Sequence, residues 1–263
     1  NVTHNRLLST GTTDNYWFWI INNADASIFE YNNISTNGTT TTNAGIVETT
    51  SMGNNISNNI IQTNGSSANY GILVQTDANN TILDKNNITT VRGTTAHGIY
   101  LLTRIFGVNI TENFLDISNT NSQGIKLDTS VNTSLIYNNT IIKGGTGGSQ
   151  IGIFSTANNF ENNITFNIIN TSGTNDNHGI QLATSHNNSL AYNRINTSGT
   201  DAAQYGIYLT GSDNNTLSRN NITTGGSSTV NHGIYLILNS SNNNITNNVI
   251  NSSGSGTVYG IAV

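Results

Sequence analysis

The sequence predicts an all-β protein: a single right-handed parallel β-helix of about ten coils, with roughly 27 residues in each coil. Three observations lead to this fold class. An apolar-x-x-Asn-x-apolar pattern occurs ten times, a glycine corner usually follows six residues after the Asn, and a Gly-Ile pair precedes the next repeat. Such a period is typical of stacked units that cannot bury their apolar faces alone.

The ten pattern asparagines are 26 to 28 residues apart: Asn5, Asn32, Asn59, Asn86, Asn113, Asn139, Asn167, Asn193, Asn220 and Asn248. The apolar residues three before and two after each Asn do not fit a helical period but fit short strands. Coils stacked at about 4.8 Å would place each Asn directly above the previous one. An unpaired buried amide costs about 1–3 kcal/mol, so we expect an internal Asn ladder in which the amides pair with one another.

A turn residue stands six positions after nearly every ladder Asn, and Arg92-Gly93 is the exception: Gly11, Gly38, Gly65, Asn119, Gly145, Gly173, Gly199, Gly226 and Gly254. Gly and Asn tolerate left-handed backbone, so we expect that conformation at these corners. After a variable loop, Gly-Ile-x-Leu and its variants open the next strand. There Ile and Leu should point inward and x outward.

The sequence motif of the repeat is clearest in Asn187-Asn188-Ser189-Leu190-Ala191-Tyr192-Asn193-Arg194-Ile195, followed by Gly206-Ile207-Tyr208-Leu209. It resembles the parallel β-helix repeat family of the pectin-lyase-like superfamily, and in particular its Asn-rich NosD-like repeats, over essentially the whole chain. The resemblance implies a scaffold shared by polysaccharide lyases, hydrolases, tailspikes, adhesins and surface-layer proteins. It is specific for the fold and nearly silent on function.

Composition narrows the classes of partner. The 263 residues form one uninterrupted repeat, so we expect a single domain over 1–263, or a segment of a longer array. Only 8% of residues are charged, the net charge is −5, and no basic patch indicates nucleic acid. The longest apolar run, Tyr16 to Ile21, is too short for membrane insertion.

An Asn, Thr and Ser surface favours an extracellular location at the cell surface. Exposed sequons would be candidate glycosylation sites: Asn33, Asn87, Asn163, Asn221 and Asn244.

No catalytic, cofactor or metal site is predicted. Asp84 and Glu112 lie one coil apart beside Lys85, but their positions in the repeat differ by one, which indicates a solvated edge. The Asp-Asp and Arg-x-Lys signatures of polygalacturonase-like enzymes are missing. Three recurrent histidines share one position of the repeat with Tyr and Gln, which favours a packing role: His97, His178 and His232. His97 and His178 lie three coils apart, which is too far to share a zinc ion.

Aromatic residues are the candidates for an interface. The stretch Tyr16-Trp17-Phe18-Trp19-Ile20 predicts either a plug over the first coil or a contact surface. The outward x position of Gly-Ile-x-Leu forms an apolar row that is either covered by loops, a lateral interface, or a groove that stacks sugars. The candidate interface residues are Trp17, Trp19, Tyr100, Phe154, Tyr208, Tyr235, Ile261 and Val263.

These features favour a non-enzymatic structural glycoprotein that forms a filament, sheath or adhesin, with itself as partner, associating end to end, and cell-surface glycans as a second partner. The alternative is a domain that binds or cleaves carbohydrate. An ice-binding module is a third reading, because Thr recurs at one position of the repeat: Thr36, Thr63, Thr90, Thr171, Thr197 and Thr224. This Thr faces the same way as the ladder Asn, so we expect a buried Thr ladder instead.

Overall fold

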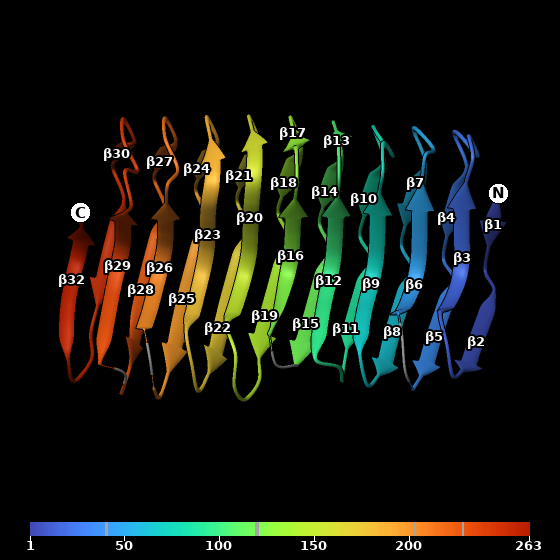
Figure 1. The fold of residues 1–263 in the computed structure, drawn as a ribbon, viewed down its shortest axis with the longest axis horizontal. Coiled ribbons are helices and arrows are strands. Elements are labelled where there is room, and N and C mark those ends of the chain that lie inside the picture. Colours follow the sequence, from blue (N-terminus) through green and yellow to red (C-terminus); the bar gives the residue numbers. More distant parts are fainter. Residues whose placement is uncertain (40–41, 119–120, 202, 228) are drawn as a thin grey trace.

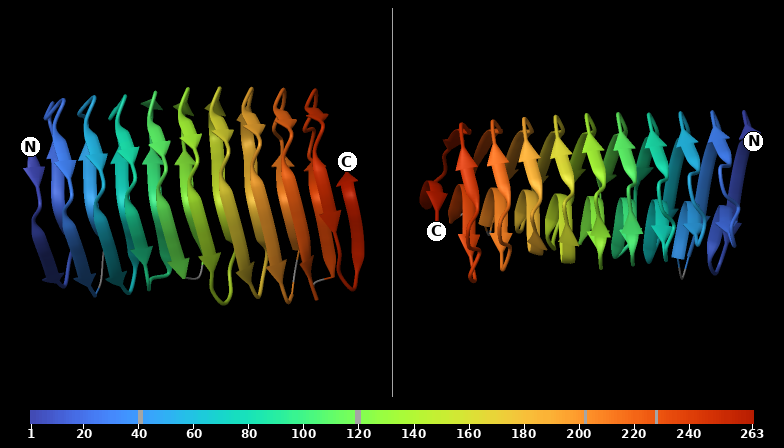
Figure 2. Two further views of the ribbon diagram at one scale, coloured as in Figure 1. Left: turned by 180° about the vertical axis from the view of Figure 1, so that it is seen from behind. Right: turned by 90° about the horizontal axis from the view of Figure 1, so that it is seen from above.

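The protein is a parallel β-helix made of three ten-stranded sheets, as the sequence predicts (Figure 1). The computed structural model describes residues 1–39, 42–118, 121–201, 203–227 and 229–263. Each coil contributes one strand to each sheet, and every strand pairs in parallel with the equivalent strand of the neighbouring coil. The two termini lie at opposite ends of the stack (Figure 2).

The strands of the first sheet are short. They are β1 (Val2–Thr3), β4 (Ile28–Glu30), β7 (Asn55–Ser57), β10 (Ile82–Asp84), β14 (Asn109–Thr111), β18 (Leu135–Tyr137), β21 (Asn163–Thr165), β24 (Ser189–Ala191), β27 (Thr216–Ser218) and β30 (Asn244–Thr246). The second sheet contains β2 (Arg6–Gly11), β5 (Asn33–Gly38), β8 (Ile60–Gly65), β11 (Asn87–Thr90), β15 (Phe114–Ser118), β19 (Thr140–Gly144), β22 (Ile168–Gly173), β25 (Arg194–Gly199), β28 (Asn221–Gly226) and β31 (Val249–Ser252).

The third sheet has the longest strands. They are β3 (Asn15–Ile21), β6 (Thr42–Thr49), β9 (Ala68–Gln75), β12 (Thr95–Leu102), β16 (Ser122–Asp128), β20 (Gln150–Phe160), β23 (Asn177–His186), β26 (Ala203–Thr210), β29 (Val230–Ile237) and β32 (Thr257–Ala262). A small additional pair joins β13 (Ile105–Phe106) to β17 (Val131–Asn132).

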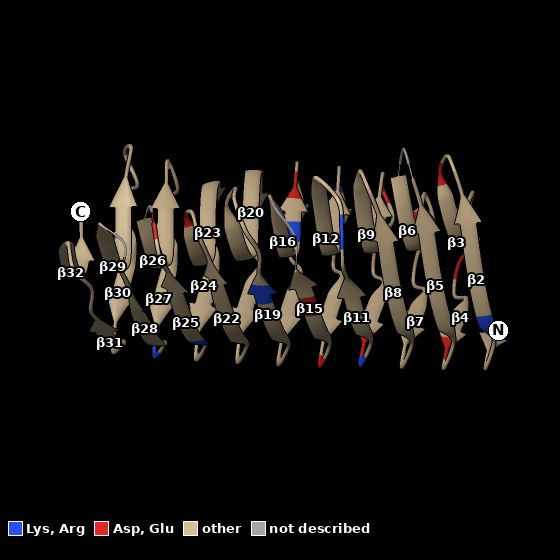
Figure 3. Ribbon diagram, turned by 90° about the horizontal axis from the view of Figure 1, so that it is seen from below, with Lys and Arg blue, Asp and Glu red and all other residues tan. Residues whose placement is uncertain are grey.

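The apolar positions of the repeat face the interior, as predicted. One coil contributes Ile164, Ile169, Ile180 and Leu182, and each of these side chains is fully buried. Burying one such side chain contributes about 1.5–3 kcal/mol, so the stacked aliphatic rows supply most of the stabilisation. Charged residues are few and scattered along the stack (Figure 3). Among the described residues there is no helix with the length and apolar character needed to cross a bilayer.

The predicted Asn ladder is confirmed. From Asn5 to Asn248, each side-chain amide donates to Oδ1 of the next ladder Asn at 2.9–3.0 Å. The ladder sits at the corner between the first and second sheets. Asn86 shows the full pattern: its Nδ2 also donates to the Ile56 carbonyl at 2.8 Å, and its Oδ1 accepts from both the backbone N–H and the side chain of Asn59. Every polar atom of the buried amide is therefore paired.

A second, shorter ladder occupies the corner between the third and first sheets. Asn162, Asn188, Asn215 and Asn243 are joined in order by amide hydrogen bonds of 3.1–3.2 Å. These residues stand five positions before the ladder Asn in their coils. The Asn-Asn-x-Leu motif of the repeat already contains this second Asn, although a second ladder was not predicted from it.

The prediction of left-handed backbone at the glycine corners is largely wrong. Gly145, Gly226 and Gly254 have positive φ, but Gly11, Gly38, Gly65, Gly173 and Gly199 do not, and Asn119 lies outside the described residues. Glycine is required at Gly38 for another reason, because a Cβ there would collide with the Asn43 amide that packs over it.

A left-handed position that recurs in all ten coils is instead the residue just before each ladder Asn, with φ between 52° and 58°. It is never glycine, and it is even occupied by the bulky Phe166 and Tyr192. Backbone of this kind costs a bulky residue about 1–2 kcal/mol. The ladder hydrogen bonds at the next residue repeat in every coil and hold the corner in this conformation.

Candidate functional site on the outer face of the third sheet

The outer face of the third sheet carries two adjacent rows of side chains where simple strand alternation would give one. The chain bends at the Gly of Gly-Ile, so the residue before Gly and the second residue after it both face outward. In β26 these residues are Tyr205 and Tyr208, and their rings are 5.1 Å apart. A Cβ at Gly206 would collide with Ile222 of the second sheet, so the bend requires glycine.

We call these rows outer row 1 and outer row 2. Outer row 1 contains Tyr16, Ala44, Tyr70, His97, Gln123, Ile151, His178, Tyr205, His232 and Tyr259. Outer row 2 contains Trp19, Val47, Leu73, Tyr100, Lys126, Phe154, Gln181, Tyr208, Tyr235 and Ala262.

The C-terminal half of the two rows forms an aromatic platform, which comprises His178, Tyr205, Tyr208, His232, Tyr235 and Tyr259. Within outer row 1 the rings of His178 and Tyr205 stack at 4.8 Å, and those of Tyr205 and His232 at 5.5 Å. Tyr208 and Tyr235 stack at 5.6 Å in outer row 2. Burial lowers the pKa of His178 to about 4 and raises the pKa of Tyr205 to about 12. His178 and Tyr205 are therefore uncharged at neutral pH.

A polar cluster lies near the middle of the same face, where His97, Tyr100, Lys126 and Asp128 meet. The Tyr100 hydroxyl donates to Asp128 Oδ2 at 3.0 Å, and Lys126 Nζ lies 2.9 Å from the same oxygen. Lys126 also lies over the Tyr100 ring, 4.8 Å from its centre. Partial burial opposes ionisation of Asp128, but Lys126 and the hydroxyl donors hold the pKa of this carboxyl below its usual range.

The cluster is built for charge pairing, and it is poorly placed for acid–base catalysis. His97 is buried, and its Nδ1 accepts a hydrogen bond from the Gln123 backbone at 3.2 Å. Burial lowers the pKa of His97 to about 3, and burial also raises the pKa of Tyr100. The reachable parts are Lys126 and Asp128, whose side chains are 19% and 21% exposed. They offer a cation and an anion at the surface.

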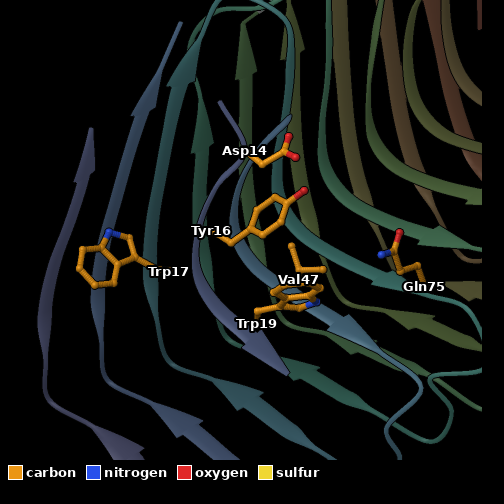
Figure 4. A pocket seen from close by; sticks show the side chains of 6 residues that line it. All are labelled: Asp14, Tyr16, Trp17, Trp19, Val47 and Gln75. Atoms are coloured by element: carbon orange, nitrogen blue, oxygen red, sulfur yellow. The ribbon is translucent and has the colours of Figure 1, made fainter. Parts of the chain in front are cut away.

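A hollow of about 450 Å³ opens at the N-terminal end of this face, lined by Asp14, Tyr16, Trp17, Trp19, Val47 and Gln75. Figure 4 shows Tyr16, Trp19 and Val47 gathered on one side, Asp14 above them and Gln75 across the space, while Trp17 stands apart. The Trp19 side chain is 61% exposed. The hollow thus combines an exposed aromatic surface with a polar rim.

The aromatic stretch at the N-terminal end divides between the two expected roles. Trp17 and Phe18 pack against the end of the core, and the Trp17 indole N–H donates to the Ser35 carbonyl at 3.2 Å. Trp17 also lines the hollow, in which Tyr16 and Trp19 lie together on one side. The first pair acts as the plug, and the second pair forms part of the outer face.

The other candidate interface residues differ in exposure. Tyr100 is buried, whereas Phe154, Tyr208 and Tyr235 are half-buried. Ile261 and Val263, in the last coil, are 48% and 95% exposed. All five candidate glycosylation asparagines are exposed: Asn33, Asn87, Asn163, Asn221 and Asn244. The recurrent Thr row is buried, as expected, and presents no Thr array to solvent.

Asp84 and Glu112 lie at an exposed corner, where Lys85 bridges them at 3.2 and 3.7 Å. Two buried charged residues, Glu48 and Lys143, were not predicted from the sequence. Their positions in the repeat contained the signal. Glu48 stands where other coils have Val74, Leu101 or Leu127, and Lys143 stands in the Thr row.

Glu48 accepts hydrogen bonds from Asn54 at 2.6 Å and Thr81 at 2.9 Å, and burial raises its pKa to about 7. This carboxyl lies inside the coil, away from the outer face, so it cannot reach a ligand there. Over the described part of the chain, no three His, Cys, Asp or Glu side chains come together as a metal site.

Comparison with known proteins supports the fold. A family model described as periplasmic copper-binding protein (NosD) matches residues 167–260, so the resemblance to NosD-like repeats is confirmed there. The crystal structure of the periplasmic alginate epimerase AlgG is 15% identical, with a TM-score of 0.51 over 86% of this chain and 74% of that chain. A mutant of that epimerase gives 15% identity and a TM-score of 0.52 over the same shares. No curated protein matches the sequence.

The residues present do not suit copper. The sequence has no Cys and a single Met, and the Tyr205 ring separates His178 from His232 in outer row 1. Copper is usually bound by several imidazole or sulfur ligands that converge on one point. The described residues offer no such convergence.

Proposed function

We propose that this chain, whose residues 167–260 form NosD-type parallel β-helix repeats, binds an extended polysaccharide along the outer face of its third sheet. One observation carries the proposal: stacked aromatic rings in two parallel rows, with the exposed Trp19 hollow at one end of the face and the aromatic platform at the other. Aromatic rings with polar tips suit sugars, because they offer an apolar face and a hydroxyl at the same place.

The polar cluster would recognise a charged group on the ligand. Lys126 is paired with Asp128, but its side chain is still 19% exposed between the hollow and the platform, and its remaining ammonium hydrogens would donate to a carboxylate or sulfate on a sugar. The related fold of the alginate epimerase supports a polysaccharide as the ligand class. Because the titratable groups of the cluster are already paired or buried, we propose binding without chemical change.

A location outside the cytoplasm is part of the proposal. The matching family and the alginate epimerase are both described as periplasmic, and exposed Asn, Thr and Ser cover much of the surface. At the cell surface or in the periplasm the chain would meet polysaccharide directly.

Affinity electrophoresis through gels that contain alginate, pectin or a neutral glucan tests the proposal. We expect slower migration in at least one gel, and a roughly tenfold or greater loss of affinity when Tyr208 and Tyr235 are both changed to Ala. Tyr192→Ala is the matched control, since Tyr192 is an exposed tyrosine at a different corner. Equal losses in both variants, or no retardation in any gel, would refute it. Unchanged polymer length and composition after incubation would support binding without catalysis.

Self-association remains a second candidate. In the last coil Ile261 and Val263 are 48% and 95% exposed, whereas their equivalents in inner coils, such as Ile207 and Leu209, are buried. A further coil, from the same chain or from another copy, would cover them. Electron microscopy at high protein concentration tests this, because single rods of uniform length would contradict association between copies.

A further inference from the structure

Two rows of buried polar side chains face each other inside the corner between the second and third sheets. One row belongs to the second sheet and contains Ser9, Thr36, Thr63, Thr90, Lys143, Thr171, Thr197, Thr224 and Ser252, with Ile117 between Thr90 and Lys143. The other belongs to the third sheet and contains Asn15, Asn43, Asn69, Ala96, Ser122, Gln150, Asn177, Gln204 and Asn231.

Many atoms in these rows have no protein partner. In the second-sheet row they are the Oγ1 atoms of Thr36, Thr63, Thr171, Thr197 and Thr224. In the third-sheet row they are Nδ2 of Asn43, Oδ1 of Asn69, Oδ1 of Asn177 and Oε1 of Gln204. All of these residues are between 0% and 2% exposed, so bulk solvent does not reach them. Leaving such atoms unpaired would cost about 1–3 kcal/mol each.

The rows can be bridged, because two coils already do so with protein atoms. The Ser9 hydroxyl lies 3.2 Å from Asn15 Oδ1. Lys143 Nζ reaches Gln150 Oε1 and also donates to the Ile117 carbonyl at 3.2 Å. Where a side chain spans the gap, the facing amide is paired. At Thr36, Thr63, Thr171 and Thr197 the hydroxyl makes no hydrogen bond to the facing amide or to any other protein atom.

We propose that ordered water molecules bridge the two rows, one per coil, at Thr36 and Asn43, at Thr63 and Asn69, at Thr171 and Asn177, and at Thr197 and Gln204. A water molecule both donates and accepts, so it can satisfy a hydroxyl together with either end of an amide. Buried waters occur about once per 27 residues in globular proteins and make about three hydrogen bonds, so one per coil is an ordinary density. Ile117 and Lys143 interrupt the line of proposed water molecules and divide it into two sections.

A high-resolution crystal structure and one substitution test the proposal together. We expect density for a water molecule within hydrogen-bonding distance of Thr197 Oγ1 and Gln204 Oε1, and its loss in Thr197→Val. Removing the hydroxyl should lower the urea midpoint by roughly 0.5 M, because the water loses a partner. Thr223→Val is the control, since Thr223 faces outward from the neighbouring strand and should leave the midpoint unchanged.

The density decides the outcome. A dry gap at all four positions of the wild-type protein would overturn the proposal. In that case Thr197→Val should raise the urea midpoint, because it would remove an unsatisfied hydroxyl from the core. Neither result depends on carbohydrate binding, so the polysaccharide proposal is tested separately.

Discussion

Replacing the buried Lys143 by the residue that its row prefers should stabilise the protein in a pH-dependent way. Lys143 is fully buried in the middle of the stack, where its Nζ donates to the Gly144 carbonyl at 2.6 Å and contacts Gln150. Burial lowers its pKa from 10.5 to about 7, against the attraction of Asp116. Lys143→Thr would give this coil the residue found in most other coils.

The magnitude follows from the pKa. A lysine with a pKa near 7 in the folded state and 10.5 in the unfolded state destabilises the fold by about 5 kcal/mol when the solution pH is below 7. The penalty falls as the pH rises from 7 and vanishes above 10.5, where the amine is neutral in both states. Thr is smaller, so about 1–2 kcal/mol of packing is lost at every pH. We expect a net gain of about 3 kcal/mol at pH 6, and a small loss near pH 10.

Urea unfolding of the wild type and Lys143→Thr at several pH values measures this difference. Lys143→Met is the matched control, because it keeps the length of the side chain and removes only the amine. We expect both variants to gain stability relative to wild type at low pH and to lose that gain as the pH rises. A stability difference that is the same at pH 6 and pH 10 would refute the reasoning.

Three further predictions concern substitutions at Glu48, Asn86 and Trp17. Glu48→Gln keeps the acceptor for Asn54 and Thr81. Burial raises the pKa of Glu48 from 4.5 to about 7, so ionised Glu48 destabilises the fold fully above pH 7 and not at all below pH 4.5. Urea unfolding should therefore show a gain of about 3 kcal/mol at pH 8 and none at pH 4, and the opposite trend would exclude a protonated Glu48. Asn86→Ala should cost about 3–5 kcal/mol in the same assay, because it leaves the Asn59 N–H and the Ile56 carbonyl unpaired, whereas the exposed Asn87→Ala should cost less than about 0.5 kcal/mol. Trp17→Phe leaves Trp19 as the only indole, and a bound polysaccharide should then change its fluorescence; an unchanged spectrum at saturation would remove the hollow from the binding face.

The repeat made most of the fold predictable from sequence. Asn86, Asn113 and Asn139 could be placed one above another because their spacing equals one coil, and a buried amide must find a partner. The second Asn ladder was equally accessible, since Asn188 and Asn215 hold one position of the repeat. It was not predicted because Asn-Asn pairs in this sequence also supply left-handed residues and N-glycosylation sequons, so the extra asparagines already had another explanation.

The candidate site was harder to predict, because it depends on a local bend. Strict alternation places Tyr208 outward and leaves Tyr205 unassigned. The glycine between them lets both side chains emerge on one face. The contact of Tyr100, Lys126 and Asp128 likewise joins different strands of the third sheet, so acids compared at one position of the repeat could not reveal it.

Oxidative footprinting with and without saturating polysaccharide tests the central claim most directly. Trp19, Tyr208, Tyr235 and Tyr259 all lie on the outer face of the third sheet, whereas the exposed Tyr31 and Tyr192 lie at the corner between the other two sheets. We expect the polysaccharide to protect the first four residues and to leave the corner tyrosines unchanged. Equal protection of both groups, or protection of the corner alone, would contradict the account.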